Sequence, residues 1–155
     1  MKKLTGLIAL LTVFTLFSCN KEVSYEEQLA KDIEVIQNYL EENGLTAQST
    51  ASGLHYIIEE PGSAEHPTAT SDVTVSYKGY FTNGQVFDQS QPGKPITFNL
   101  QQVIPGWTEG IQLFGRGGKG TLLIPSGLGY GKRGSIGGAI PGNTVILFDV
   151  ELINF

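Results

Sequence analysis

Glycine is concentrated in one part of this chain, where 13 of the 20 glycines lie between Gly106 and Gly142. Glycine weakens the interior of a helix or strand, but it suits turns and places where two backbones approach closely. No collagen-like three-residue period accompanies these glycines. The region therefore predicts short elements joined by tight loops.

Short apolar segments around these glycines show the alternation typical of half-buried strands. Val73, Val75 and Tyr77 alternate with polar residues, and Asn83-Gly84 follows as a hairpin turn signal. Further strands are predicted over residues 54–58, 121–124 and 144–153, whereas residues 107–114 can hold only a short helix. Several short strands with one short helix predict an α+β domain on a mostly antiparallel sheet.

A helical pattern precedes this domain. Ser24 and Glu27 form a capping box, and Asn43-Gly44 provides a stop signal, so a helix is predicted over residues 25–42. One apolar stripe runs along it, composed of Leu29, Ile33, Ile36 and Leu40. We expect the stripe to pack against the chain's own domain. A dimerising coiled coil is the less favoured alternative, because two heptads are few.

The first residues have the pattern of a secretory signal. Lys2 and Lys3 precede an uncharged apolar run over residues 4–17, which is shorter than the ~20 residues that span a bilayer. The run ends in Leu16-Phe17-Ser18-Cys19, which resembles a bacterial lipobox, where cleavage precedes a lipidated cysteine. The alternative is an ordinary secretory signal with an incidental cysteine. Both alternatives predict export.

These patterns divide the chain into three predicted parts. Residues 1–18 are a lipoprotein signal peptide, residues 19–52 an acidic helical arm ending in a linker over 45–52, and residues 53–155 the folded domain. With Cys19 lipidated, the expected location is the cell envelope, anchored to a bacterial membrane.

Composition excludes several classes of function. A formal charge of -5 and a pI of about 4.9 argue against nucleic-acid binding. A single cysteine excludes an internal disulfide framework and a cysteine-based zinc site, and two histidines exclude a histidine-rich metal centre. Two Gly-x-Gly-x-x-Gly stretches begin at Gly115 and Gly129, but neither has the strand-before, helix-after context of a dinucleotide site.

Several blocks of sequence occur in a recognisable order: Val75-Ser76-Tyr77-Lys78-Gly79-Tyr80, Val86-Phe87-Asp88, Val103-Ile104-Pro105-Gly106-Trp107, Tyr130-Gly131, Ile140-Pro141 and Leu147-Phe148-Asp149-Val150. Over residues 52–155 this order resembles the FK506-binding-protein (FKBP) family of peptidyl-prolyl isomerases. The resemblance implies an antiparallel sheet of five to six strands wrapped around one short helix, here preceded by a single amphipathic helix. Gly53-Leu54-His55-Tyr56 followed by Pro61-Gly62 resembles the entry strand of bacterial envelope members, in which a helical segment precedes the isomerase domain.

The resemblance also implies a site without metal or cofactor, in which an apolar pocket holds a proline ring. Phe98, Phe114 and Leu147 are expected to be core residues only. The residues carried over as catalytic are Asp88, Tyr130, Ile104 (through its backbone N–H) and Trp107, the pocket floor. Those carried over as substrate-binding are Tyr77, Phe87, Ile96, Val103, Ile140 (as a cap from the long loop) and Phe148.

The implied activity is peptidyl-prolyl cis-trans isomerisation that assists the folding of exported proteins. The expected partners are X-Pro segments of exported polypeptides, inhibitors of the FK506 and rapamycin type, and a membrane through the lipid on Cys19. The alternative is a weakly catalytic proline-binding chaperone or recognition module. Two departures leave room for it: Ile96 stands where members often have an aromatic residue, and the loop over 132–139 differs from the family pattern.

Overall fold

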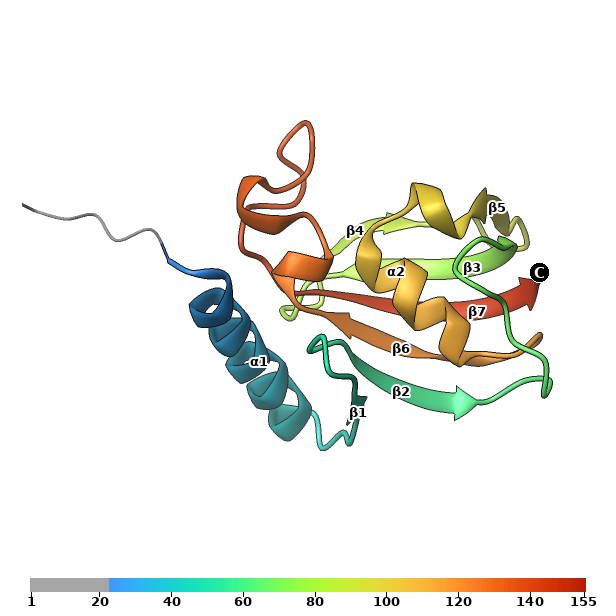
Figure 1. The fold of residues 1–155 in the computed structure, drawn as a ribbon, viewed down its shortest axis with the longest axis horizontal. Helices are drawn as coiled ribbons and strands as arrows, with labels where there is room; N and C mark the ends of the chain where they lie inside the picture. The colour runs from blue at the N-terminus through green and yellow to red at the C-terminus, as the bar shows by residue number, and fades with distance from the viewer. Residues whose placement is uncertain (1–22) are drawn as a thin grey trace, which may run out of the picture.

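The structure is a computed structural model that describes residues 23–155. A seven-stranded antiparallel sheet has the order β1-β2-β6-β7-β3-β4, and β5 also pairs with β3 (Figure 1). Its strands are β1 (Gln48–Ser49), β2 (His55–Glu60), β3 (Asp72–Tyr80), β4 (Val86–Gln89), β5 (Ile96–Asn99), β6 (Lys119–Ile124) and β7 (Ile146–Asn154). The α+β fold class is confirmed. The sheet exceeds the expected five to six strands, in part because two residues of the predicted linker form β1.

Two α-helices lie against the sheet: α1 (Tyr25–Glu42) and α2 (Pro105–Gly110). Single 3-10 turns connect the elements; they are η1 (Leu100–Gln102), η2 (Ile111–Leu113), η3 (Ser126–Leu128) and η4 (Gly131–Arg133). The central helix begins two residues earlier than predicted and ends sooner. The reason is Pro105, which occupies the first turn, where a missing N–H costs no hydrogen bond.

Helix α2 packs closely on β6 because its contact residues are glycines. A Cβ on Gly106 would lie 2.6 Å from Ile124 Cγ2, and one on Gly110 would lie 2.6 Å from Leu122 Cδ1. A larger residue at either position would force these side chains or the helix itself to shift. This contact puts the buried side chains of Trp107 and Ile111 into the main core with β3, β6 and β7.

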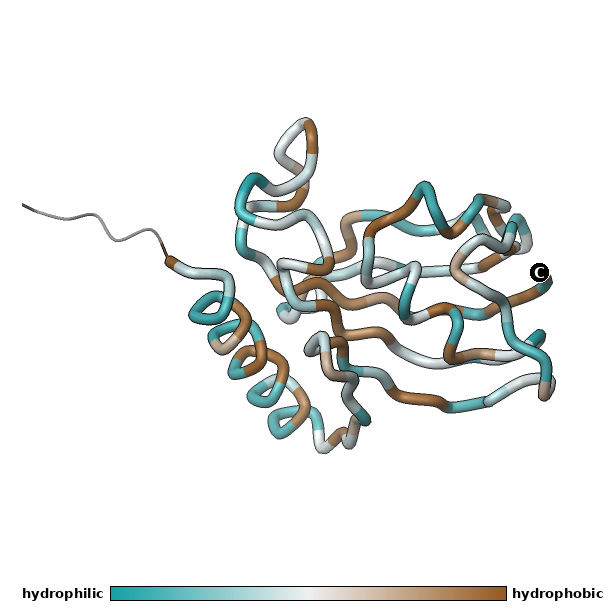
Figure 2. The backbone as a smooth tube through the Cα atoms, viewed as in Figure 1, coloured by the Kyte–Doolittle hydropathy of each residue, from teal (hydrophilic) through white to brown (hydrophobic). Residues whose placement is uncertain are grey.

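Helix α1 has the predicted bounds, and its stripe packs on the chain's own domain. The Glu27 N–H donates to Ser24 Oγ at 3.1 Å, and the Ser24 N–H donates to Glu27 Oε2 at 3.2 Å, which completes the capping box. Ile36 is fully buried in a second cluster with Leu123, Val145 and Leu147. Figure 2 shows the apolar residues of α1 on the side that faces the sheet. The helix is therefore part of the fold.

The signal peptide and Cys19 lie outside the described residues, so their assignment stays a prediction. From residue 23 onward, no helix combines the length and apolar character that a bilayer span needs.

Candidate active site

A cavity of about 450 Å³ opens between α2 and the sheet. Its walls come from β3, β4, β5, α2, β7 and two connecting segments, so only the folded chain can assemble it. The lining residues are Tyr77, Asp88, Ile96, Phe98, Gln102, Val103, Ile104, Trp107, Tyr130 and Phe148.

Trp107 lies at the centre of an aromatic cluster. Its ring makes edge-on contacts with Tyr77 at 5.2 Å and with Phe148 at 5.1 Å between centroids, and Phe98 packs against it at 5.2 Å. Such contacts add to the stabilisation from burial. Only 5% of Trp107 is exposed, and its Nε1 has no hydrogen-bond partner in the described chain. Trp107 thus presents a rigid apolar surface at the base of the cavity.

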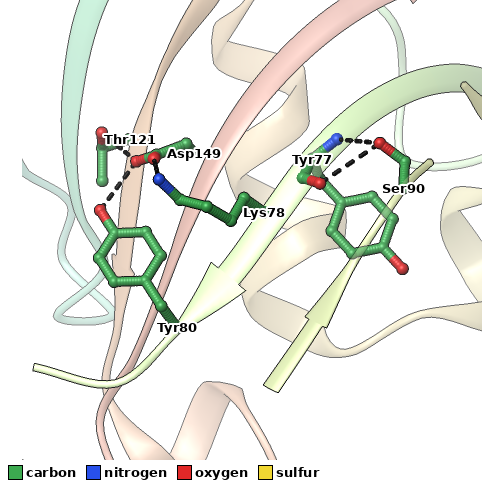
Figure 3. A network of polar contacts seen from close by, with 6 residues as sticks. All are labelled: Tyr77, Lys78, Tyr80, Ser90, Thr121 and Asp149. Atoms are coloured by element: carbon green, nitrogen blue, oxygen red, sulfur yellow. Dashed lines mark hydrogen bonds and ion pairs between the residues drawn. The ribbon is translucent and has the colours of Figure 1, made fainter. Parts of the chain in front are cut away.

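Tyr77 is held at both its hydroxyl and its backbone. Its hydroxyl donates to Asp88 Oδ2 at 2.7 Å. Its backbone N–H donates to Ser90 Oγ at 3.0 Å, and the Ser90 hydroxyl donates to the Tyr77 carbonyl at 3.3 Å (Figure 3). The Ser90 N–H also donates to that carbonyl, at 3.0 Å. Burial, reinforced by the hydrogen bond to Asp88, raises the pKa of Tyr77 to about 12. The phenol therefore remains a donor to Asp88 through the physiological range.

The opposite face of β3 carries a second polar network, also drawn in Figure 3. Asp149 on β7 accepts hydrogen bonds at Oδ1 from Tyr80 at 2.8 Å and Thr121 at 3.1 Å, and its Oδ2 pairs with Lys78 at 2.7 Å. Burial, followed by the bond to Asp149, raises the pKa of the Tyr80 phenol. These contacts join β3, β6 and β7, and so support the two strands that carry Tyr77 and Phe148.

Two hydrogen-bond donors border the cavity. The Tyr130 side chain lies at its rim, just beyond η3, and burial together with the charge of Asp88 raises the pKa of this phenol. Ile104 precedes α2 as its N-cap residue. Over residues 23–155, neither the Tyr130 hydroxyl nor the Ile104 N–H donates a hydrogen bond to the protein. Both groups suit a carbonyl oxygen of a bound peptide.

The cavity brings together eight of the predicted site residues, namely Asp88, Tyr130, Ile104, Trp107, Tyr77, Ile96, Val103 and Phe148. Phe87 and Ile140 are not among its lining residues. Phe87 packs behind the wall, with its ring 5.5 Å from that of Phe148. Ile140 is 4% exposed and belongs to the same core cluster as Trp107 and Phe148, so its predicted role as a cap stays a prediction.

Sequence reasoning missed two lining residues. Phe98 was expected to be core only, but it lines the cavity beside Ile96. The signal was available, because residues two apart on a strand share a face and Ile96 was already assigned to the site. Gln102 ends η1, and no periodic pattern singled it out.

No three potential metal-ligating side chains gather within the part of the chain that the structure describes. The site's functional groups are an apolar aromatic surface, one carboxylate tied to a phenol, and two hydrogen-bond donors.

Comparison with known proteins places this chain in a family. The model of the FKBP-type peptidyl-prolyl cis-trans isomerase family matches residues 63–153. The chain therefore belongs to the FKBP-type peptidyl-prolyl cis-trans isomerase family.

Individual relatives are similar over most of this chain. The FKBP-type isomerase FkpA of Aeromonas hydrophila is 50% identical over 107 residues, which cover 68% of this chain and 39% of the relative. FkpA of Escherichia coli K12 is 44% identical over 126 residues, covering 81% and 45% respectively. The chain thus spans less than half the length of these two relatives.

Solved structures agree with the fold. The crystal structure of FkpA from Escherichia coli has a TM-score of 0.71 at 40% identity, covering 83% of this chain and 59% of that one. A peptidyl-prolyl cis-trans isomerase from Pseudomonas syringae pv. tomato also has a TM-score of 0.71, at 32% identity, with 86% of this chain and 97% of that chain covered.

The pair formed by Tyr77 and Asp88 predicts a pH dependence. The folded pKa of Tyr77 is about 12, above the ordinary value of 10.0. Burial of the neutral phenol, together with its bond to Asp88, therefore favours the folded state fully below pH ~10, and this contribution is lost as pH rises through the folded pKa. In alkaline unfolding experiments, Tyr77→Phe should lose less stability than the wild type between pH ~10 and ~12. Equal losses in the two proteins would contradict the assignment.

Proposed function

We propose that this protein is a peptidyl-prolyl cis-trans isomerase that acts on X-Pro segments of exported polypeptides. The observation that carries the proposal is the cavity itself: an aromatic base at Trp107 with two donors at its border, Tyr130 and Ile104 N–H, that have no acceptor within residues 23–155. The family membership supports the same reaction. The matched region covers less than half of each of two curated relatives. The proposal for this chain is therefore based on the site described above.

The geometry suits the chemistry of amide rotation. The barrier of ~18–20 kcal/mol comes from amide resonance, and the cis and trans forms of an X-Pro bond differ little in energy. The planar amide has a larger dipole than the twisted one, so an apolar cavity disfavours the planar ground state more. Each tenfold acceleration requires only ~1.4 kcal/mol of this difference.

In this mechanism the side chains bind and orient the substrate and form no covalent bond with it. The proline ring lies on Trp107 between Tyr77 and Phe148, which fixes one side of the rotating bond. The Tyr130 hydroxyl and Ile104 N–H bind carbonyl oxygens of the peptide, which restricts the other side. Asp88 holds Tyr77 in the wall through the 2.7 Å hydrogen bond. Inhibitors of the FK506 and rapamycin type would compete for the same apolar cavity.

The test is prolyl cis-trans exchange on the purified protein, with peptides that differ in the residue before proline, with and without FK506. We expect catalysis that FK506 inhibits. Asp88→Ala and Tyr130→Phe should each lower kcat/KM roughly tenfold, equivalent to ~1.4 kcal/mol, in a folded protein. Unchanged turnover in both variants would contradict the assigned roles. A folded wild type that binds the peptides without catalysis would favour the chaperone or recognition module.

We further propose that Cys19 is lipidated and anchors the protein in the cell envelope. The support is the lipobox-like end of the apolar run over residues 4–17. Mass spectrometry of the mature protein should find its first residue to be a diacylated Cys19. Cys19→Ser should leave the protein in the soluble fraction. A wild-type mature chain that begins elsewhere, without lipid, would favour the ordinary secretory signal.

A further inference from the structure

Helix α1 reaches the segment that carries Tyr130 through one buried carboxylate. Asp32 is only 2% exposed. Its Oδ2 accepts hydrogen bonds from the Ser126 N–H at 2.7 Å and the Ser126 hydroxyl at 2.6 Å, and its Oδ1 accepts one from Gln28 Nε2 at 2.8 Å. A buried carboxylate is costly unless such bonds compensate for lost hydration. Asp32 and Ser126 therefore hold each other in place.

Ser126 is coupled to Tyr130 by a tight turn. Ser126 opens η3, where the Leu128 N–H donates to the Pro125 carbonyl at 2.9 Å and the Gly129 N–H donates to the Ser126 carbonyl at 3.0 Å. Tyr130 follows directly and lines the cavity. A displacement of Ser126 is consequently passed through one turn to a residue that borders the site.

A second contact holds η3 against the same helix. A Cβ on Gly127 would lie 2.8 Å from Cε2 of Tyr25, so the Tyr25 ring sits directly against the Gly127 backbone. In Figure 1, α1 runs beside the orange segment that contains η3. Two successive residues of η3 thus contact the first half of α1, by a charged hydrogen bond and by packing.

We propose that Asp32 is a positioning residue for Tyr130: by fixing Ser126, it keeps the phenol at the rim of the cavity. The N-terminal helix then contributes to the activity of the domain. The kinetic test of this inference rests on the proposed isomerase function. The hydrogen-exchange test does not.

The first test measures kinetics. Asp32→Ala should lower kcat/KM about tenfold, because a misplaced positioning group costs rate. Asp32→Asn keeps an acceptor oxygen for Ser126 and should stay within about threefold of the wild type. The control is Ile36→Val, which loosens the packing of α1 on Leu123, Val145 and Leu147 without touching η3, and it should leave kcat/KM unchanged.

A double-variant cycle separates positioning from general destabilisation. If Asp32 acts through Tyr130, then Tyr130→Phe should have much less effect in the Asp32→Ala protein than in the wild type. Equal effects in both backgrounds would overturn the proposal, provided that kcat/KM is corrected for the folded fraction.

The second test needs no catalysis. Amide hydrogen exchange at residues 126–131 should become at least tenfold faster in Asp32→Ala and stay unchanged in Ile36→Val. Unchanged exchange in Asp32→Ala would overturn the positioning role. A wild-type protein without isomerase activity would instead contradict the proposed function, while the exchange experiment would still decide the role of Asp32.

Discussion

Trp107→Leu is expected to reduce kcat/KM for proline peptides about a hundredfold, the scale of loss that follows when a bound substrate is misplaced by an ångström. Leucine keeps the position apolar but removes the flat surface on which a proline ring would lie. It also removes the ring contacts at 5.1 to 5.2 Å that set the positions of Tyr77, Phe98 and Phe148. Prolyl exchange at matched folded concentrations measures the effect.

The control for this variant is Phe114→Leu. Phe114 is a fully buried aromatic residue of the same core, but it does not line the cavity. Both substitutions should lower the free energy of unfolding by about 2 kcal/mol, the usual range for lost aromatic volume. Only Trp107→Leu should also lose catalysis. Comparable activity losses in both variants would mean that Trp107 affects catalysis only by stabilising the fold.

Local signals in the sequence explain why some elements were predicted to the residue. The bounds of α1 follow from Ser24, Glu27 and Asn43-Gly44, whose capping interactions are complete within a few residues. The central helix was placed less well, because its start depends on Pro105 and its close packing depends on Gly106 and Gly110 meeting β6. The contact between these glycines and β6 forms only in the folded chain, and no local sequence pattern indicates it.

The candidate site was likewise predicted in part from the sequence. The order of aromatic blocks predicted eight residues that line one cavity, although they come from distant segments. Ile140 is not among the lining residues, and its loop closes on itself: the Ile140 N–H donates to Ser135 Oγ at 2.8 Å, and its carbonyl accepts from the Ser135 N–H at 2.9 Å. Its side chain is buried in the same core cluster as Trp107 and Phe148, and local sequence patterns do not show how such a loop folds onto the core.

Asp32 illustrates what a linear pattern cannot reveal. It lies on an acid-rich helix, where a solvated face is the usual explanation for a carboxylate. Its partner Ser126 is 94 residues away, and Ser126 has no feature in the sequence that marks it as a hydrogen-bond donor to a buried acid. Only the docking of α1 brings the two together, so the contact between this helix and the segment before Tyr130 emerges from the tertiary structure.

Gly120→Ala is expected to destabilise the protein by about 3 kcal/mol, the upper range for forcing extra volume into a packed interior. Gly120 lies in β6, opposite Ile58 on β2 and Val150 on β7. A Cβ there would lie 1.9 Å from the Ile57 carbonyl oxygen and 2.9 Å from Phe114 Cε1. The first neighbour is backbone, so β2 itself must shift and give up hydrogen bonds to β6.

The matched control is Gly137→Ala, at a glycine with φ +87° and no atom within 4 Å of the added Cβ. That change introduces only backbone strain of about 1 kcal/mol, without any steric overlap. Thermal unfolding should therefore show a drop in Tm of about 10 °C for Gly120→Ala and about a third of that for Gly137→Ala. Similar drops would contradict the close approach of β2 and β6. A large loss of stability for Gly120→Ala alone would support the register between β2 and β6. That register holds the sheet around α2, and α2 and the sheet together enclose the cavity.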